Sequence, residues 1–184
     1  MRSLLMVLAV SALTGPGIPV VAQEMPADRQ ASLDTYIRVL STHFRLPQTE
    51  VRILTEGRVP ADELPVALRL ARFSGIPPVS LLAQRRSGDS WLVIARRYNL
   101  GAASFHVAIP DGQVDPSVAR VHGLFRDSPP SQWDAINLTD AEFIALANLL
   151  VLSSETGVSH GQILEARAAA GSFVGALSRV SVPR

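Results

Sequence analysis

The sequence predicts an all-helical protein of three repeated helix-turn-helix units, with a loop-rich insertion between the second unit and the third. Three observations predict this fold class. Apolar residues recur three and four positions apart, as on the buried face of a helix; capping boxes mark helix starts; and glycines follow the apolar runs at repeated spacings. We expect the units at about 33–70, 64–100 and 139–180, and the insertion at 103–137.

The first segment of the chain has the pattern of a secretory signal peptide. Arg2 supplies a basic start, residues 4–13 are apolar, and the small residues Val20 and Ala22 precede a favourable cleavage site. A membrane-spanning helix needs about 20 unbroken apolar residues, whereas prolines and glycines interrupt this stretch after roughly a dozen. We therefore expect cleavage after Ala22, removal of residues 1–22, and no stable membrane anchor in the exported protein.

The rest of the chain, residues 23–184, has the size of one ordinary domain. All 17 basic residues are arginines, and one of them, Arg2, lies in the predicted signal peptide, so residues 23–184 carry 16 arginines and 16 acidic residues. This balance argues against a nucleic-acid partner, which requires a surplus of Lys and Arg. The chain contains no cysteine, so we expect packing rather than disulfides to stabilise it.

Helices are expected in the first two units from their apolar spacing. An apolar stripe predicts a helix over about 33–44, and a second stripe begins at Leu64. The second helix is expected to run to Phe73 and to stop at Gly75, because glycine adopts the left-handed cap conformation without steric cost. Residues 79–86 are expected to form a further helix.

The clearest helix start lies in the third unit. Thr139 and Glu142, three residues apart, form a capping box ahead of a long apolar run that ends at Gly157. We expect this helix to be the most buried of the protein. A second capping box, Ser159 with Gln162, predicts another helix directly after it.

The second and third units share several residues at matching places. The corresponding pairs are Gly75 and Gly157, Arg85 and Arg167, Gly88 and Gly171, and Trp91 and Phe173. The first unit matches more weakly, with a turn after Phe44 and a glycine stop at Gly57. We expect the aromatic pair to anchor adjacent helices in the core rather than to stack on a ligand, and the arginine pair to bind a helix carboxylate or carbonyl rather than a substrate.

The insertion at 103–137 has a different character. Residues 104–110 predict a short strand or an extended segment, and residues 118–125 predict one short helix among prolines and glycines. Loops on a rigid scaffold often carry function. The insertion is therefore one place to look for a binding surface.

No pattern in the sequence predicts a catalytic, metal or cofactor site. There is no Gly-x-Ser-x-Gly elbow, and the histidines lack metal-ligand spacing; they are His43, His106, His122 and His160. Two acidic pairs are available, Asp62 with Glu63 and Asp140 with Glu142. Both are expected in first helical turns, where acids interact favourably with the helix dipole.

One short segment resembles a LysM peptidoglycan-binding module. Residues 88–98 read Gly-Asp-Ser-Trp-Leu-Val-Ile-Ala-Arg-Arg-Tyr, similar to the helix-opening stretch of that family. The resemblance implies a glycan-contacting edge, and its candidate ligand-binding residues are Gly88, Asp89, Ser90 and Trp91. The segment departs from the family just upstream, where LysM modules have a strand and residues 79–86 predict a helix.

A wider resemblance covers most of residues 23–184. Residues 85–91, the extended 105–110, the acid-capped helix from Asp140 and the closing 170–173 together look like a group of uncharacterised exported helical proteins of bacteria. The resemblance implies a helical fold and a location in the cell envelope. It implies no catalytic residue.

Three functions are consistent with these patterns. The first is a non-enzymatic protein of the bacterial envelope, periplasmic or secreted, that binds a protein or peptide partner through a groove between its helical units or through the insertion. The second is peptidoglycan or other glycan binding through the LysM-like stretch. The third is an envelope hydrolase without a recognisable motif.

Overall fold

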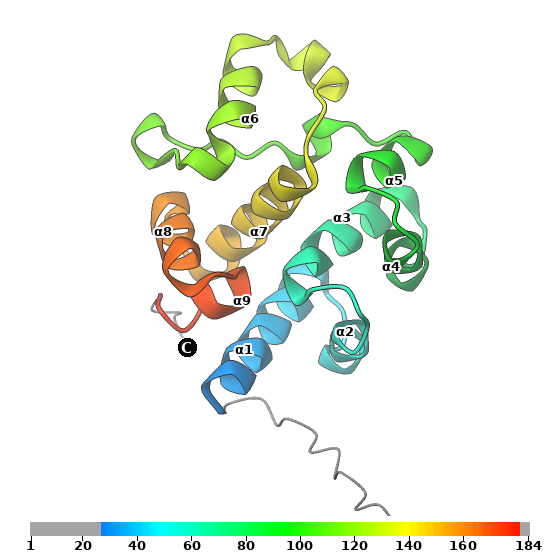
Figure 1. The fold of residues 1–184 in the computed structure, drawn as a ribbon, viewed down its shortest axis with the longest axis vertical. Coiled ribbons are helices and arrows are strands. Elements are labelled where there is room, and N and C mark those ends of the chain that lie inside the picture. The colour runs from blue at the N-terminus through cyan, green and yellow to red at the C-terminus, as the bar shows by residue number, and fades with distance from the viewer. Residues whose placement is uncertain (1–26, 181–184) are drawn as a thin grey trace, which may run out of the picture.

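The computed structural model describes residues 27–180, and this part of the chain is all-helical, as predicted (Figure 1). The predicted signal peptide and its cleavage site lie outside the described residues. The α-helices are α1 (Ala27–Phe44), α2 (Gln48–Thr55), α3 (Leu64–Ser74), α4 (Pro78–Arg86), α5 (Trp91–Arg97), α6 (Pro116–Asp127), α7 (Asp140–Thr156), α8 (His160–Ala170) and α9 (Phe173–Ala176). Short 3-10 turns are η1 (Ala61–Glu63), η2 (Ala102–Phe105), η3 (Asp111–Gln113) and η4 (Pro130–Ala135).

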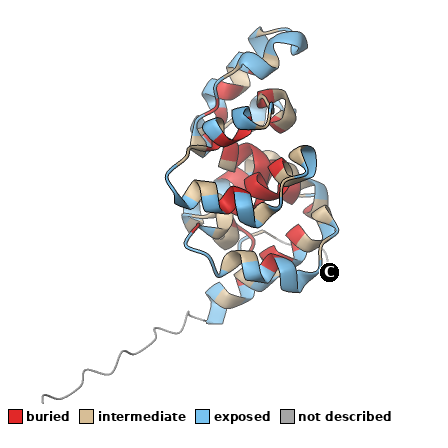
Figure 2. Ribbon diagram, turned by 90° about the vertical axis from the view of Figure 1, so that its right-hand side faces the viewer, coloured by how far each residue is buried: buried red, intermediate tan, exposed pale blue. Residues whose placement is uncertain are grey.

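Helix α7 is the central element of the fold. It packs against α1, α3, α5, α6 and α8, and it runs through the middle of the molecule in Figure 1. Ten of its 17 residues are buried, more than in any other described helix, which confirms the expectation from its apolar run. Figure 2 shows the same distribution, with buried residues in the middle and exposed residues on the outer turns. The Thr139–Glu142 capping box is also confirmed.

A buried polar residue ties α7 to its neighbours. Asn148 is fully buried, and its Nδ2 donates to the carbonyl oxygens of Asp62 and Ile144, each at 2.8 Å. The hydroxyl of Tyr36 in α1 donates to Asn148 Oδ1 at 2.6 Å. Burial raises the pKa of Tyr36, and the charge of Asp62 raises it further. Every strong hydrogen-bonding group in this cluster has a partner, as a buried polar cluster requires.

Two predicted glycine stops have the expected backbone. Gly75 after α3 and Gly157 after α7 have φ values of 73° and 69°, in the left-handed region that favours glycine. The hydroxyl preceding each glycine accepts the amide two residues further on, from Ile76 to Ser74 and from Val158 to Thr156, both at 3.2 Å. The two turns therefore have the same local geometry.

The first unit departs from its prediction in two ways. Helix α1 starts at Ala27, six residues before the expected 33, because its polar first turns are mostly exposed and add no apolar stripe to the sequence. Gly57 was expected as a glycine stop, but it is not among the described residues with positive φ. A left-handed residue that was not expected, Arg45 with φ 57°, occupies the preceding turn, between α1 and α2.

The insertion forms one end of the molecule in Figure 1. Helix α6 is four residues longer than the expected 118–125, because the Asp115 carboxylate accepts the amide of Ser117 at 2.8 Å and Pro116 opens the helix. Between η2 and η3 the chain is extended without pairing to another strand. Of the two alternatives for 104–110, a strand or an extended segment, the described chain thus shows no strand.

Candidate functional site

The strongest candidate site is a groove between two interhelical turns. The turn between α1 and α2 contributes Phe44 and Leu46, and the turn between α3 and α4 contributes Ile76 and Pro77. Ala71 of α3 also lines the space, whose volume is about 450 Å³. We call this feature the turn groove. Helices α2 and α4, which follow the two turns, lie on the same side of the molecule (Figure 1).

Two exposed apolar side chains lie near the turn groove along the chain, although neither lines it. Phe73 is 52% exposed and Val79 is 56% exposed, and they flank the turn that forms one wall. The described chain has five exposed large apolar residues in all, so two of them at one turn form a local concentration. Exposed apolar surface beside a hollow is typical of binding surfaces.

Two arginines, Arg45 and Arg72, line the same groove. Both are exposed, and neither forms an ion pair with any residue between 27 and 180. A third arginine, Arg69, is held away from the groove by donating to the carbonyl oxygen of Ser104. Burial lowers the pKa of Arg69, and the nearby charge of Arg72 lowers it further. The groove therefore combines an apolar lining with a cationic rim.

A second groove, of about 670 Å³, lies between α1, η1 and the α8–α9 turn. Asp62 is one of two acids that line this groove, and its carboxylate accepts hydrogen bonds from the backbone amides of Phe173 and Val174 at 2.9 and 3.0 Å. This acid is therefore occupied in joining η1 to the start of α9. The groove also has both signs of charge in its lining, from Asp28 and Arg29.

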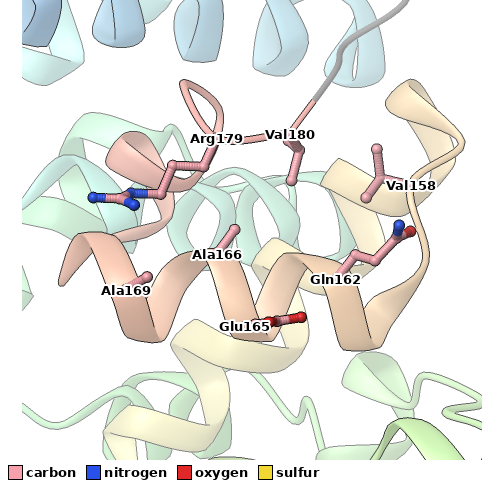
Figure 3. Close-up of a pocket in the computed structure, with 7 residues that line it drawn as sticks. All are labelled: Val158, Gln162, Glu165, Ala166, Ala169, Arg179 and Val180. Carbon is pink, nitrogen blue, oxygen red and sulfur yellow. The ribbon is translucent and has the colours of Figure 1, made fainter.

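A third groove, of about 500 Å³, runs along α8 and is drawn in Figure 3. Gln162 and Glu165 come from α8, whereas Arg179 and Val180 come from the segment after α9. Val180 is the last described residue of the chain. We assign no role to this groove, because its lining includes this last described residue.

A small cavity of about 100 Å³ lies in the insertion. His106 stacks on Trp133 with ring centroids 4.1 Å apart and contacts the edge of Phe125 at 4.9 Å. Burial lowers the pKa of His106, and His122 lowers it further. His122 Nε2 donates to the Ile109 carbonyl at 3.0 Å. The two histidines thus stabilise the packing of the insertion.

The residues predicted from the LysM resemblance lie together at the α4–α5 turn. Gly88 is exposed with φ 101°, Asp89 pairs with Arg97 at 2.8 Å, and Ser90 caps α5 by accepting the amide of Val93 at 3.2 Å. Trp91 is fully buried. None of these predicted residues lines the hollows described above.

The burial of Trp91 confirms its expected role as a core anchor, and Phe173, 1% exposed, has the same role. The indole Nε1 of Trp91 donates to Glu63 Oε2 at 2.6 Å. A fully buried indole has no free face for stacking on a sugar ring. Any glycan contact at this turn therefore has to come from its exposed neighbours.

One member of each acidic pair, Glu63 just before α3 and Asp140 in the first turn of α7, binds Arg85. Arg85 Nε donates to Glu63 at 2.7 Å, and Arg85 Nη1 donates to Asp140 at 2.7 Å. Burial acts to lower the pKa of Arg85, but these two carboxylates raise it overall. The prediction that Arg85 binds a helix carboxylate is confirmed. The corresponding prediction for Arg167 is wrong for its Nε atom, because this atom is buried and has no hydrogen-bond partner within residues 27–180.

The sequence suggested a groove between helical units but not the residues of the turn groove, because they appear in the sequence only as helix ends and cap neighbours. One signal was present. The turns after α3 and α7 have glycine at the left-handed position, whereas the turn after α1 has Arg45. An arginine where its counterparts have glycine marked this turn as unusual.

Within residues 27–180, no group of three or more His, Cys, Asp or Glu side chains is arranged to hold a metal ion. No single helix in that range is long and apolar enough to span a membrane; α7 and α8 meet the criterion only as a pair, bent by 117°. No protein-family model, curated protein or solved structure matches the chain.

Proposed function

We propose that this protein is an exported, non-enzymatic component of the bacterial cell envelope that binds a segment of another protein, or a peptide, in the turn groove. The observation that carries this proposal is the groove itself, whose lining combines apolar side chains, among them Phe44, Leu46 and Ile76, with two exposed arginines. A protein that exposes such a surface next to a hollow has a favourable place for a partner's apolar side chains.

The proposal includes the three-unit repeat. In support of it, α3–α4–α5 and α7–α8–α9 share their glycine turns, and Arg85 and Arg167 lie over the rings of Trp91 and Phe173 at 5.5 and 5.6 Å. The first unit then consists of α1, α2 and the start of α3. Stacked helical units expose grooves at their junctions, and the turn groove lies between the first unit and the second.

Export is a separate part of the proposal and has its own test. The support is the basic, apolar and small-residue pattern of residues 1–22. When the full chain is expressed in a bacterium with an outer membrane, the protein should be recovered from the periplasmic fraction or the medium. Its mass should correspond to a chain beginning at Gln23, and recovery of the uncut chain in the cytoplasm would contradict export.

Partner binding can be tested by site-specific photo-crosslinking in the envelope. Phe44, which lines the turn groove, is replaced by p-benzoylphenylalanine, so that the crosslinker takes the place of an existing aromatic ring. Leu124, 37% exposed on α6, is replaced in the same way as a distal control. We expect an adduct of defined mass from position 44 and none from position 124.

A groove-blocking variant decides whether such an adduct depends on the groove. Ala71→Gln places a longer side chain in the groove without removing core atoms, and Ala168→Gln makes the same change on an exposed position of α8. We expect Ala71→Gln to abolish the adduct and Ala168→Gln to preserve it. An adduct that survives Ala71→Gln, in a protein shown by circular dichroism to be folded, would overturn the proposed function.

Peptidoglycan binding at the α4–α5 turn is the second candidate. It is favoured by the exposure of Gly88 and by the Asp89 side chain, which remains 34% exposed beside Arg97. Sedimentation with purified sacculi tests it. Binding that Asp89→Asn weakens would support this candidate, whereas a wild-type protein that stays in the supernatant would eliminate it.

A further inference from the structure

We infer that the turn groove selects an apolar peptide segment that carries a carboxylate, and that Arg45 and Arg72 recognise this carboxylate. The inference rests on the proposed function and adds the chemistry of the partner. Three observations carry it: the charge of the lining, the backbone of Arg45, and the absence of ion pairs between these arginines and the residues that the structure describes.

The lining of the turn groove has cationic side chains and no acidic one. The other two large grooves differ, since Glu165 lines one of them together with Arg179, and Asp28 and Asp62 line the other. Of these three grooves, only the turn groove therefore offers an approaching carboxylate attraction without repulsion. A planar guanidinium can donate two parallel hydrogen bonds to a carboxylate.

The backbone of Arg45 indicates that its side chain has a use beyond the fold. The amide of Leu46 donates to the Ser41 carbonyl at 3.1 Å, and the amide of Arg45 donates to the Thr42 carbonyl at 3.3 Å. This is the Schellman arrangement, whose left-handed residue is usually glycine. A side chain at that position disfavours folding, by roughly tenfold in the equilibrium.

The other two units use Gly75 and Gly157 at this position. An unfavourable backbone conformation that persists at one turn suggests a functional constraint on the side chain. Arg72 has an additional structural reason for its place, because a cation in the last turn of α3 interacts favourably with the helix dipole. Arg45 is therefore the more informative of the two residues.

A peptide fits these observations better than a membrane does. The groove lies between two turns and is small, at about 450 Å³, which suits a few side chains. Binding to anionic lipid generally uses a cluster of several basic residues, and only Arg45 and Arg72 line this groove. Binding to anionic vesicles is therefore one of the outcomes that would count against the inference.

Three fluorescent hexapeptides test the inference. They share apolar residues, leucine, proline and phenylalanine, and differ at one position, which is glutamate, glutamine or lysine. Affinities are measured by fluorescence anisotropy with the wild-type protein recovered from the envelope fraction. We expect the glutamate peptide to bind about tenfold more tightly than the glutamine peptide, as for a charged hydrogen bond, and the lysine peptide to bind most weakly. The preference should shrink with added salt.

Arg45→Gly is the most informative variant, because it should weaken the binding of the glutamate peptide while it raises the stability of the protein. The substitution relieves the left-handed backbone, so the melting temperature should rise while the preference for glutamate over glutamine is lost. Arg45→Lys should keep part of the preference, since it keeps the charge but not the planar fork. Arg72→Gln should weaken the preference, and Arg86→Gln, at the equivalent end of α4, should leave it unchanged.

Each contrary result has a distinct meaning. Equal binding of the glutamate and glutamine peptides would overturn the inference and leave the proposed function standing. If no peptide bound and Ala71→Gln left the crosslinked adduct intact, the proposed function would fall as well. Binding of phosphatidylglycerol vesicles that depends on Arg45, or a lower melting temperature for Arg45→Gly, would also overturn the inference.

Discussion

The α4–α5 junction and the α8–α9 junction each pass through a left-handed glycine, Gly88 or Gly171, into a short helix, but they surround the start of that helix with different polar groups. At the first, Trp91 donates through its indole to Glu63 and through its amide to Asp140, and Arg85 binds both carboxylates. At the second, Phe173 has no side-chain donor, and its amide donates to Asp62.

The acceptor at each junction comes from a distant part of the chain. Asp140, at the start of α7, accepts the first amide of α5, and Asp62, just before α3, accepts the first amide of α9. The helices before the insertion (α1–α5) and those after it (α7–α9) therefore each supply the carboxylate that caps the last α-helix of the other group. These contacts join the two groups of helices, so acids that the sequence alone predicts only as first-turn residues matter for the whole fold.

The largest effect is expected for Glu63→Ala at the first junction. It leaves the Trp91 indole N–H and the Arg85 guanidinium without this acceptor. Breaking a buried ion pair on one side costs about 3–5 kcal/mol. Because the Arg85 side chain remains 21% exposed, we expect about 2–3 kcal/mol of lost unfolding free energy, measured by urea denaturation. Glu63→Gln should lose less, since it keeps an acceptor; equal losses would contradict this account.

Asp62→Ala should destabilise the second junction less. It leaves the amides of Phe173 and Val174 without their acceptor, a loss comparable to that of a helix N-cap, about 1–2 kcal/mol. Hydrogen exchange resolved by residue should show faster exchange at residues 173–176 than in wild type. Exchange at residues 91–97 should not change, and a uniform increase across both regions would argue against two separate caps.

Arg167→Met should have a smaller effect of the opposite sign. The buried Nε of Arg167 has no partner within residues 27–180, so replacing the guanidinium with an apolar chain of similar length removes an unsatisfied group. We expect a gain of about 1 kcal/mol in unfolding free energy. Arg85→Met should instead destabilise the protein. If both substitutions destabilised it equally, Arg167 would have a partner of its own.

The smallest expected effect is a pH dependence of stability that involves His160, the first residue of α8. Burial lowers the pKa of His160 from the ordinary histidine value of 6.5. The corresponding helix α4 starts with Pro78, which has no titratable group. A lowered folded pKa means that the folded state disfavours the proton. Stability is therefore full above pH 6.5 and declines as pH falls from 6.5 toward the folded pKa.

His106 has a lowered pKa for the same main reason, burial, so it contributes in the same direction within the insertion. Denaturation midpoints at several pH values test this prediction, together with NMR titration of the imidazole protons. His160→Gln and His106→Gln should each reduce the decline, and the double variant should reduce it further. A wild-type midpoint that rises between pH 7 and pH 5 would contradict the sign.

The ends of the elements were predictable where their signals are local. The Thr139 and Ser159 capping boxes and the stops at Gly75 and Gly157 need only nearby residues. The start of α1 was missed, because its exposed polar turns carry no periodic signal. Gly57 follows the end of α2 without the left-handed conformation, because glycine favours but does not require it.

For this protein, the sequence by itself determined the helical class and the central position of the apolar α7, since both follow from side-chain spacing along one segment. Only the tertiary structure decided which groups Asp62, Glu63 and Asp140 accept, and that the turns after α1 and α3 enclose one groove. Those features join residues far apart in the chain, and helical periodicity carries no information about which distant surfaces meet.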